Sequence, residues 1–274
     1  MKYLEQCRKI AEENAEKTAI VDRNGERFTS YYEIDTLSGR IAAKLTAEGY
    51  GEDSFIVLCL DRSMEYVAAY IGVIKAGCAV VPVIKSYPAE RIAYIVKDCG
   101  AALLLDENFL SDIEKYSPAE TASVSDSAPA VIVYTSGSTG RPKGIIHSRA
   151  SFEAAAAHNM KLFCGVEDIV YGASAPMSFV VFMTEYIASL GLGGCTHILS
   201  DAVRKDARSI ERYFNVHAVT ISFISPQLLK IFKGADSLRR VITGSERLSN
   251  CCGNGYELLN AYGMSETLAV VCSF

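Results

Sequence analysis

The chain has 274 residues, of which 50% are hydrophobic and 22% are charged, so it can bury an ordinary core as one large domain or two fused ones. The formal net charge is -5 and the lysines and arginines are dispersed, which argues against nucleic acid as a partner. No segment approaches the ~18 uncharged apolar residues of a membrane span, and the N-terminal stretch lacks the apolar core of a signal sequence. We therefore expect a globular protein of the cytoplasm.

Cysteine and histidine give no indication of a metal centre. Nine cysteines are scattered without a CxxC pair, so we expect reduced thiols that serve as small apolar side chains. The four histidines show no zinc-ligand spacing, and we expect no metal bound by histidine.

The first half of the chain alternates apolar runs with helical patterns. After a charged N-terminal helix, we expect strands at residues 19–22, 27–30, 55–60, 78–83 and 102–106, with helices at 30–49, 63–77 and 88–100. Residues 107–128 break this rhythm and are predicted to form a surface connection between two subdomains, 1–128 and 129–274.

The second half resumes the alternation. We expect strands at 131–135, 144–148, 168–173, 196–200, 218–224, 239–243, 256–262 and 268–274, with helices at 151–163 and 206–214 between them. Near-continuous apolar strands that alternate with helices are typical of α/β proteins. The predicted fold is therefore stacked, mostly parallel sheets with helices on both faces.

The stretch VIVYTSGSTGRPKGIIHS, residues 131–148, carries three glycines and several small hydroxyl residues between two apolar runs. Glycine lets backbone N–H groups turn toward a common centre, and such a concavity holds anionic oxygens. The Walker loop requires glycine before its lysine, whereas here Arg141 and Pro142 precede Lys143. The pattern predicts a polyphosphate-binding loop of another kind.

Several motifs together resemble one family. YTSGSTGRPKG, FTSYYEID, IKAGCAVVPVIKSYPAERIAYIV, RRVITGSERL and NAYGMSET are similar, in this order, to motifs of the adenylate-forming superfamily. That superfamily comprises acyl-CoA synthetases, luciferases and the adenylation domains of nonribosomal peptide synthetases. The resemblance runs through the whole chain, and it implies the N-terminal core of that fold without its distal β-barrel and C-terminal domain.

The resemblance also implies roles toward ATP and Mg²⁺. Lys143 would stabilise the loop or the leaving pyrophosphate, Tyr262 would lie along the adenine, Ser265 would bond a phosphate oxygen, and Glu266 would coordinate Mg²⁺. Lys143, Thr139 and Glu266 are the implied catalytic residues. The remaining implied nucleotide-binding residues are Thr135, Ser136, Gly137, Ser138, Gly140, Gly244, Ser245, Glu246, Asn260, Ala261 and Gly263.

In this family a carboxylate attacks the α-phosphorus of ATP, which gives an acyl-adenylate and pyrophosphate, and a phosphopantetheine thiol then attacks the adenylate. Catalysis is positioning and electrostatic stabilisation, with no enzyme nucleophile. Met264 in YGMSE is typical of CoA ligases, whereas SYPAERIAYIV is typical of peptide synthetases. The thiol therefore belongs either to coenzyme A or to a carrier protein.

Members that activate amino acids carry an aspartate that pairs with the α-ammonium group, and here Val180 follows the aromatic Phe179 at that place. A buried ammonium facing valine would lose its charge partner at a cost of several kcal/mol. We expect an aryl, hydroxy, keto or short acyl acid without a free α-amino group. The implied acid pocket comprises Phe179, Val180, Val181, Thr184, Phe223, Ile242, Gly244, Ala261, Ala269 and Val270.

Two alternatives stay open. If the alignment is shifted, the chain is an amino-acid adenylation domain with an unusual amine contact, although Glu185 has its own counterpart in the family motif. The family's ribose-binding aspartate and C-terminal lysine have no counterpart before Phe274, which implies an excised fragment or a natural truncation. We therefore expect at most feeble adenylation by the chain alone, and a non-catalytic nucleotide-binding module is the second alternative.

Overall fold

The computed structural model describes residues 2–136, 141–244, 246 and 255–273, and it divides into two compact units. The first unit comprises Met1–Glu16, Tyr31–Ala154 and Met177–Phe179, and the second comprises Lys17–Ser30, Ala155–Pro176 and Val180–Phe274. The units are interleaved along the sequence. A compact unit is not yet a domain that folds alone, so the boundary after residue 128 stays a prediction.

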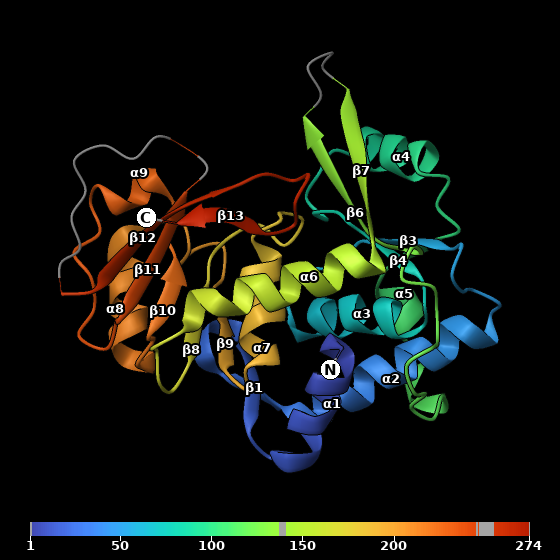
Figure 1. The fold of residues 1–274 in the computed structure, drawn as a ribbon, viewed down its shortest axis with the longest axis horizontal. Coiled ribbons are helices and arrows are strands. Elements are labelled where there is room, and N and C mark those ends of the chain that lie inside the picture. Colours follow the sequence, from blue (N-terminus) through green and yellow to red (C-terminus); the bar gives the residue numbers. More distant parts are fainter. Residues whose placement is uncertain (1, 137–140, 245, 247–254, 274) are drawn as a thin grey trace. The chain divides into compact units, whose positions relative to one another are not determined.

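The first unit contains a five-stranded sheet in the order β5-β3-β4-β6-β7. The strands β5, β3, β4 and β6 run parallel, whereas β6 and β7 form an antiparallel hairpin (Figure 1). Their bounds are β3 Phe55–Leu58, β4 Ala79–Pro82, β5 Leu103–Leu105, β6 Pro129–Ser136 and β7 Pro142–Ser148.

Helices cover both faces of this sheet. Helix α3 packs against β3 and β4, while Ile95 of α4 lies in a core cluster with Val57, Val81 and Ile132 on the other face. Gly77 (φ +84°) follows the end of α3, as the sequence predicts. The helices are α1 Tyr3–Glu13, α2 Tyr31–Ala47, α3 Met64–Lys75, α4 Ala89–Asp98, α5 Glu107–Leu110 and η2 Ile113–Lys115.

The segment 107–128 is more structured than the sequence indicates. It carries α5 and η2, and Phe109 and Ile113 are buried. The buried ammonium of Lys44 on α2 donates to the Phe109 carbonyl (2.7 Å) and to Asp112 Oδ1 (2.5 Å). The segment therefore packs on the first unit instead of running free over its surface.

The second unit contains an eight-stranded sheet in the order β13-β12-β11-β10-β8-β9-β1-β2. The six inner strands run parallel, and the edge strands β2 and β13 pair antiparallel with their neighbours. The strands are β1 Thr18–Asp22, β2 Arg27–Ser30, β8 Val170–Ala173, β9 Cys195–Ile198, β10 Ile221–Phe223, β11 Arg240–Gly244, β12 Glu257–Gly263 and β13 Val270–Ser273.

Short helices accompany this sheet. They are η1 Arg23–Gly25, η3 Lys161–Phe163, η4 Met183–Ala188, α7 Ser189–Gly191, α8 Ala207–His217 and α9 Pro226–Leu229; α6 (Arg149–Met160) begins in the first unit and ends in the second. The segment η4 is a π-helix, which the sequence analysis did not foresee. Such segments are rare and often occur at functional sites.

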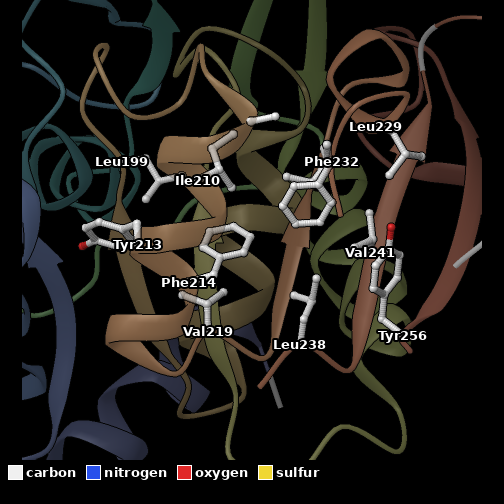
Figure 2. Packing of buried hydrophobic residues seen from close by; sticks show 12 residues of the cluster. Leu199, Ile210, Tyr213, Phe214, Val219, Leu229, Phe232, Leu238, Val241 and Tyr256 are labelled. Atoms are coloured by element: carbon white, nitrogen blue, oxygen red, sulfur yellow. The ribbon is translucent and has the colours of Figure 1, made fainter. Parts of the chain in front are cut away.

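The core on one face of the second sheet forms around α8. Figure 2 shows the ring of Phe214 beside Val219, with Ile210 and Phe232 in the same cluster and Val241 contributed by β11. Because side chains alternate along a strand, the neighbours of Val241 on β11 point to the opposite face. That opposite face carries Ile242 and Gly244, two residues of the predicted acid pocket.

The mixed sheets with helices on both faces confirm the predicted fold class. The six cysteines with described side chains are free thiols. Within residues 2–136, 141–244, 246 and 255–273, no helix combines the length and apolar character that crossing a membrane requires.

Candidate active site

The predicted phosphate loop joins the two strands of the β6–β7 hairpin. Thr135 pairs with Lys143, and Ser136 pairs with Pro142, so the strands bring the two ends of the loop together. The Lys143 side chain is exposed, and that of Thr135 is half-buried. The predictions for Gly137, Ser138, Thr139 and Gly140, and for Ser245 in the second unit, lie outside the described residues.

A side-chain network ties the loop end of this hairpin to α4. The Tyr134 hydroxyl donates to Asp98 Oδ2 (2.7 Å), and the Tyr94 hydroxyl lies 3.3 Å from Asp98 Oδ1 and 3.2 Å from the Pro142 carbonyl. Burial and the bond to Asp98 raise the pKa of Tyr134, so its hydroxyl stays protonated and donates. These contacts anchor both strands where the loop begins and ends.

The ring of Tyr134 packs across the hairpin against Gly144. The two residues pair across β6 and β7, and a Cβ added at Gly144 would lie 3.0 Å from Tyr134 Cζ. Since that contact is tighter than ordinary packing, the last glycine of the PKG motif leaves room for the ring. The sequence analysis gave no role to Tyr94, Asp98 or Tyr134, because their meeting depends on the fold.

In the second unit, predicted pocket residues gather at the carboxyl ends of three parallel strands. Phe223 pairs with Ile242, and Gly244 pairs with Ala261, which places all four on one face of β10, β11 and β12. Ile242 is buried and Phe223 is half-buried. Ligands of open α/β sheets bind at this edge.

The contact between Gly244 and Ala261 is unusually close. A Cβ added at Gly244 would lie 2.1 Å from the Ala261 carbonyl oxygen, and no side chain can fit at that distance. The requirement for glycine therefore comes from the approach of the two backbones at the ends of β11 and β12. The neighbouring pair is Thr243 with Asn260, which is half-buried.

The residues after β12 are open to solvent. Tyr262 is 55% exposed, and the side chain of Glu266 is exposed as well. Gly263 lies close to the backbone of Ala269, since a Cβ at Gly263 would be 3.1 Å from the Ala269 carbonyl oxygen. The side chain of Ser265 is half-buried. The exposed Glu266 carboxylate fits a hard cation such as Mg²⁺, whereas Glu246 accepts hydrogen bonds from Gln227 (3.3 and 3.4 Å).

Val180 and Val181 begin the segment that leads into η4. Their carbonyls accept the first backbone hydrogen bonds of that segment, from Met183, Thr184 and Glu185. Both valines are half-buried, while Phe179, assigned to the first unit, is 51% exposed. Thr184 lies within η4 and is buried.

Glu185 is completely buried and has a structural role. Its Oε1 accepts the backbone N–H groups of Ser174 (2.9 Å) and Ala175 (3.0 Å), which follow β8. Charge-assisted bonds of this kind hold η4 to the end of the strand. One oxygen of the carboxylate, Oε1, is thus held by the backbone of its own unit.

Asn159 of α6 links two parts of the predicted acid pocket. Its Oδ1 accepts from the Thr184 hydroxyl (3.3 Å) and from the Val270 N–H (3.3 Å), and its Nδ2 donates to the Leu268 carbonyl (3.1 Å). Thr184 and Val270 are therefore neighbours, and Ala269 lies between the two bonded backbone groups. Asn159 could not be singled out from the sequence, since one amide in an alanine-rich helix carries no signal.

The sheets and the strand-end residues place the fold among the N-terminal cores of adenylate-forming enzymes. Two solved structures share it: the N-terminal domain of FACL13 from Mycobacterium tuberculosis and the Klebsiella oxytoca NpsA N-terminal subdomain in complex with 3-hydroxyanthranilyl-AMSN. Each gives a TM-score of 0.85, at 21% and 20% identity, covering 98% and 100% of this chain and 77% and 75% of the neighbours.

The chain belongs to the AMP-binding enzyme family, which it matches over residues 7–274. It is 30% identical to surfactin synthase subunit 2 of Bacillus subtilis over 92% of its own length, and 30% identical to tyrocidine synthase 1 of Brevibacillus parabrevis over 94%. It spans 8% and 26% of the length of these two relatives. The predicted superfamily is thus confirmed.

Proposed function

We propose that this chain binds ATP and a carboxylic acid and takes part in forming an acyl-adenylate. A carboxylate oxygen attacks the α-phosphorus, the bond to the bridging oxygen breaks, and pyrophosphate leaves with the electron pair. The observation that carries the proposal is the family match, together with a β6–β7 hairpin that brings Thr135 and Lys143 to the two ends of the glycine loop.

In the first unit the proposed roles concern the phosphates. Thr135 and Ser136 end β6, and Lys143 is the second residue of its partner strand at the other end of the loop, with an exposed side chain. A lysine on a rigid strand can stabilise negative charge that accumulates on the phosphates. Thr139 stays a proposed catalytic residue of the loop.

In the second unit the proposed roles concern adenine, phosphate and metal. The exposed ring of Tyr262 offers a flat face to adenine, and Gly244 with Asn260, Ala261 and Gly263 supplies strand-end backbone beside it. Ser265 would donate to a phosphate oxygen, and Glu266 would hold Mg²⁺. When bound, Mg²⁺ neutralises phosphate charge and assists departure of pyrophosphate.

The proposed acid lacks a free α-amino group. Val180 supplies no carboxylate at the place where amino-acid-activating members carry aspartate, and the Glu185 carboxylate already accepts two backbone N–H groups. The alternative, an amino-acid adenylation domain, has support from the peptide synthetases among the relatives. The absence of a carboxylate at Val180 favours the first proposal.

The acceptor of the acyl group is proposed to be a phosphopantetheine thiol. The peptide synthetase relatives favour a carrier-protein arm over free coenzyme A, while Met264 favours coenzyme A. Both thiols are therefore proposed as acceptors.

Calorimetric titration of the chain with ATP and magnesium tests the proposal. Lys143→Ala and Tyr262→Ala are each expected to weaken binding about tenfold, which corresponds to one charge-assisted or stacking contact. Lys115→Ala and Tyr32→Ala are matched controls, since both side chains are similarly exposed but lie outside the proposed site. Equal affinities in all four variants would contradict the assignment, and saturable binding without any acid-dependent pyrophosphate exchange would favour a non-catalytic nucleotide-binding module.

A further inference from the structure

Asn159 is a polar side chain with no solvent exposure, and it lies in the part of α6 that belongs to the second unit. Burying an amide is unfavourable unless its groups find partners. Asn159 satisfies this condition through three long-range hydrogen bonds to Thr184, Leu268 and Val270. None of the motifs that identify the family contains Asn159, so its role is an open question.

The partners fix the orientation of the amide. Val270 offers a backbone N–H, which can only donate, and Leu268 offers a carbonyl, which can only accept. The oxygen of Asn159 must therefore face Val270, and its NH₂ group must face Leu268. The Thr184 hydroxyl, 3.3 Å from the same oxygen, then acts as a second donor.

The backbone that Asn159 holds is strained. Leu268 has a φ of +54°, a left-handed conformation that is uncommon for residues other than glycine, and its side chain is buried. Such a conformation persists only where the surroundings enforce it. Asn159 bonds the carbonyl of Leu268 and the N–H of Val270, so it holds the backbone on both sides of Ala269.

We propose that Asn159 is a positioning residue that sets the acyl specificity of the site. It ties Thr184 on η4 to the Leu268–Val270 backbone, and Thr184, Ala269 and Val270 are proposed walls of the acid pocket. The inference rests on the proposed function, because it assumes that these walls contact the acid. Asn159 itself would touch neither the acid nor the nucleotide.

Removing the amide is expected to make the pocket residues Thr184, Ala269 and Val270 less firmly positioned. Asn159→Leu keeps the approximate size of the side chain but leaves the Leu268 carbonyl and the Val270 N–H without their buried partner. The Leu268–Val270 segment can then shift relative to Thr184. The loss should therefore appear as reduced discrimination between acyl groups.

The experiment measures the affinities of the chain for acetyl, 3-phenylpropanoyl and 3-hydroxybenzoyl non-hydrolysable adenylate analogues, together with AMP. The three analogues share one nucleotide, so effects on nucleotide binding cancel in the ratio of their dissociation constants. For Asn159→Leu we expect the ratio between the best and the worst analogue to fall about fivefold or more, toward equality.

Two further variants separate positioning from general destabilisation. Ser38→Ala removes the hydrogen bond from an equally buried side chain, the Ser38 hydroxyl in α2 of the first unit, to the Asp35 carbonyl (3.0 Å), and should leave the ratio unchanged. Asn159→Asp keeps an acceptor for Thr184 and Val270 but loses the amide donor to Leu268, so its ratio should lie between those of wild type and Asn159→Leu. Urea unfolding shows which variants fold, and Asn159→Asp carries the test if Asn159→Leu does not.

The outcomes distinguish the two proposals. A wild-type chain that binds neither AMP nor any analogue contradicts the proposed function, and the inference falls with it. A wild-type chain that binds the analogues without preference leaves no specificity for Asn159 to set and overturns the inference alone. The inference is also overturned if the folded Asn159 variants keep the wild-type ratio, or if Ser38→Ala lowers it equally.

Discussion

At the scale of single residues, Gly244 makes the tightest backbone contact among the described glycines of the proposed site. Gly244→Ala would place a methyl carbon 2.1 Å from the Ala261 carbonyl oxygen, so one strand end must move. We expect a loss of about 1–3 kcal/mol in the free energy of unfolding and weaker binding of AMP. Urea denaturation and AMP titration measure the two effects.

Gly51→Ala is the matched control for this substitution. A Cβ at Gly51 meets no atom within 4 Å, and its φ is not in the left-handed region. Its unfolding free energy should stay within about 0.5 kcal/mol of wild type. Equal stabilities of the two alanine variants would show that β11 and β12 do not approach as described.

His197 gives a second prediction at this scale. Its ring is buried, and Nδ1 lies 3.1 Å from the Tyr213 hydroxyl, while burial, followed by the nearby His217, lowers the pKa of His197 to about 4. The pKa is thus lower in the folded than in the unfolded chain, so protonation favours unfolding. The contribution to stability is complete above pH 6.5 and is lost as pH falls toward 4.

Between pH 7 and pH 5 this linkage should cost about 2 kcal/mol of unfolding free energy. Urea unfolding at several pH values measures the slope, and His197→Gln removes the titrating group. The slope should become shallower in that variant. An identical slope in wild type and His197→Gln would show that another group titrates.

At the scale of elements, the hairpin that carries the glycine loop depends on α4. Tyr134→Phe removes the hydrogen bond from Tyr134 to Asp98 but keeps the ring over Gly144. This charge-assisted hydrogen bond should contribute about 1 kcal/mol, so amide exchange in β6 and β7 should become about fivefold faster. Hydrogen-exchange mass spectrometry measures this rate.

The control for the hairpin is Tyr32→Phe, because the Tyr32 side chain is largely exposed and lies in α2. Its exchange in β6 and β7 should match wild type. Unchanged exchange in Tyr134→Phe would mean that the backbone ladder alone fixes the hairpin.

The elements also show what a sequence can and cannot predict. Buried strands such as β3, β4 and β11 follow from uninterrupted apolar runs, and α2 follows from the three- and four-residue spacing of Ile34, Ile41 and their neighbours. The π-helix η4 could not be foreseen, because its extra residue per turn depends on tertiary contacts such as that of Glu185 with Ser174.

The candidate site divides in the same way. Residues inside short motifs, such as Tyr262 and Lys143, can be identified because the motif itself indicates the role of the residue. No motif indicates a role for Asn159, Asp98 or Tyr94. Only the fold brings these residues to their hydrogen-bond partners. Pattern analysis can therefore identify residues that contact ligands, whereas the residues that hold them in place require the structure.

At the scale of the whole molecule, the chain combines two sheets of different construction. The five-stranded sheet presents the predicted phosphate loop on an antiparallel hairpin, and the eight-stranded sheet presents the predicted adenine and acid residues at the ends of parallel strands. Each sheet thus carries a distinct part of the proposed chemistry. The substrate proposal depends on one position in particular, Val180.

Binding of matched pairs of adenylate analogues by the chain tests the central claim most directly. Phenylalanyl and 3-phenylpropanoyl analogues differ only in the α-ammonium group, and alanyl and propanoyl analogues form a smaller pair. We predict that the member without ammonium binds about 100-fold tighter in at least one pair, since an unpaired buried charge costs several kcal/mol. Val180→Asp should reduce or reverse that preference, whereas tighter wild-type binding of the aminoacyl member in both pairs would contradict the account.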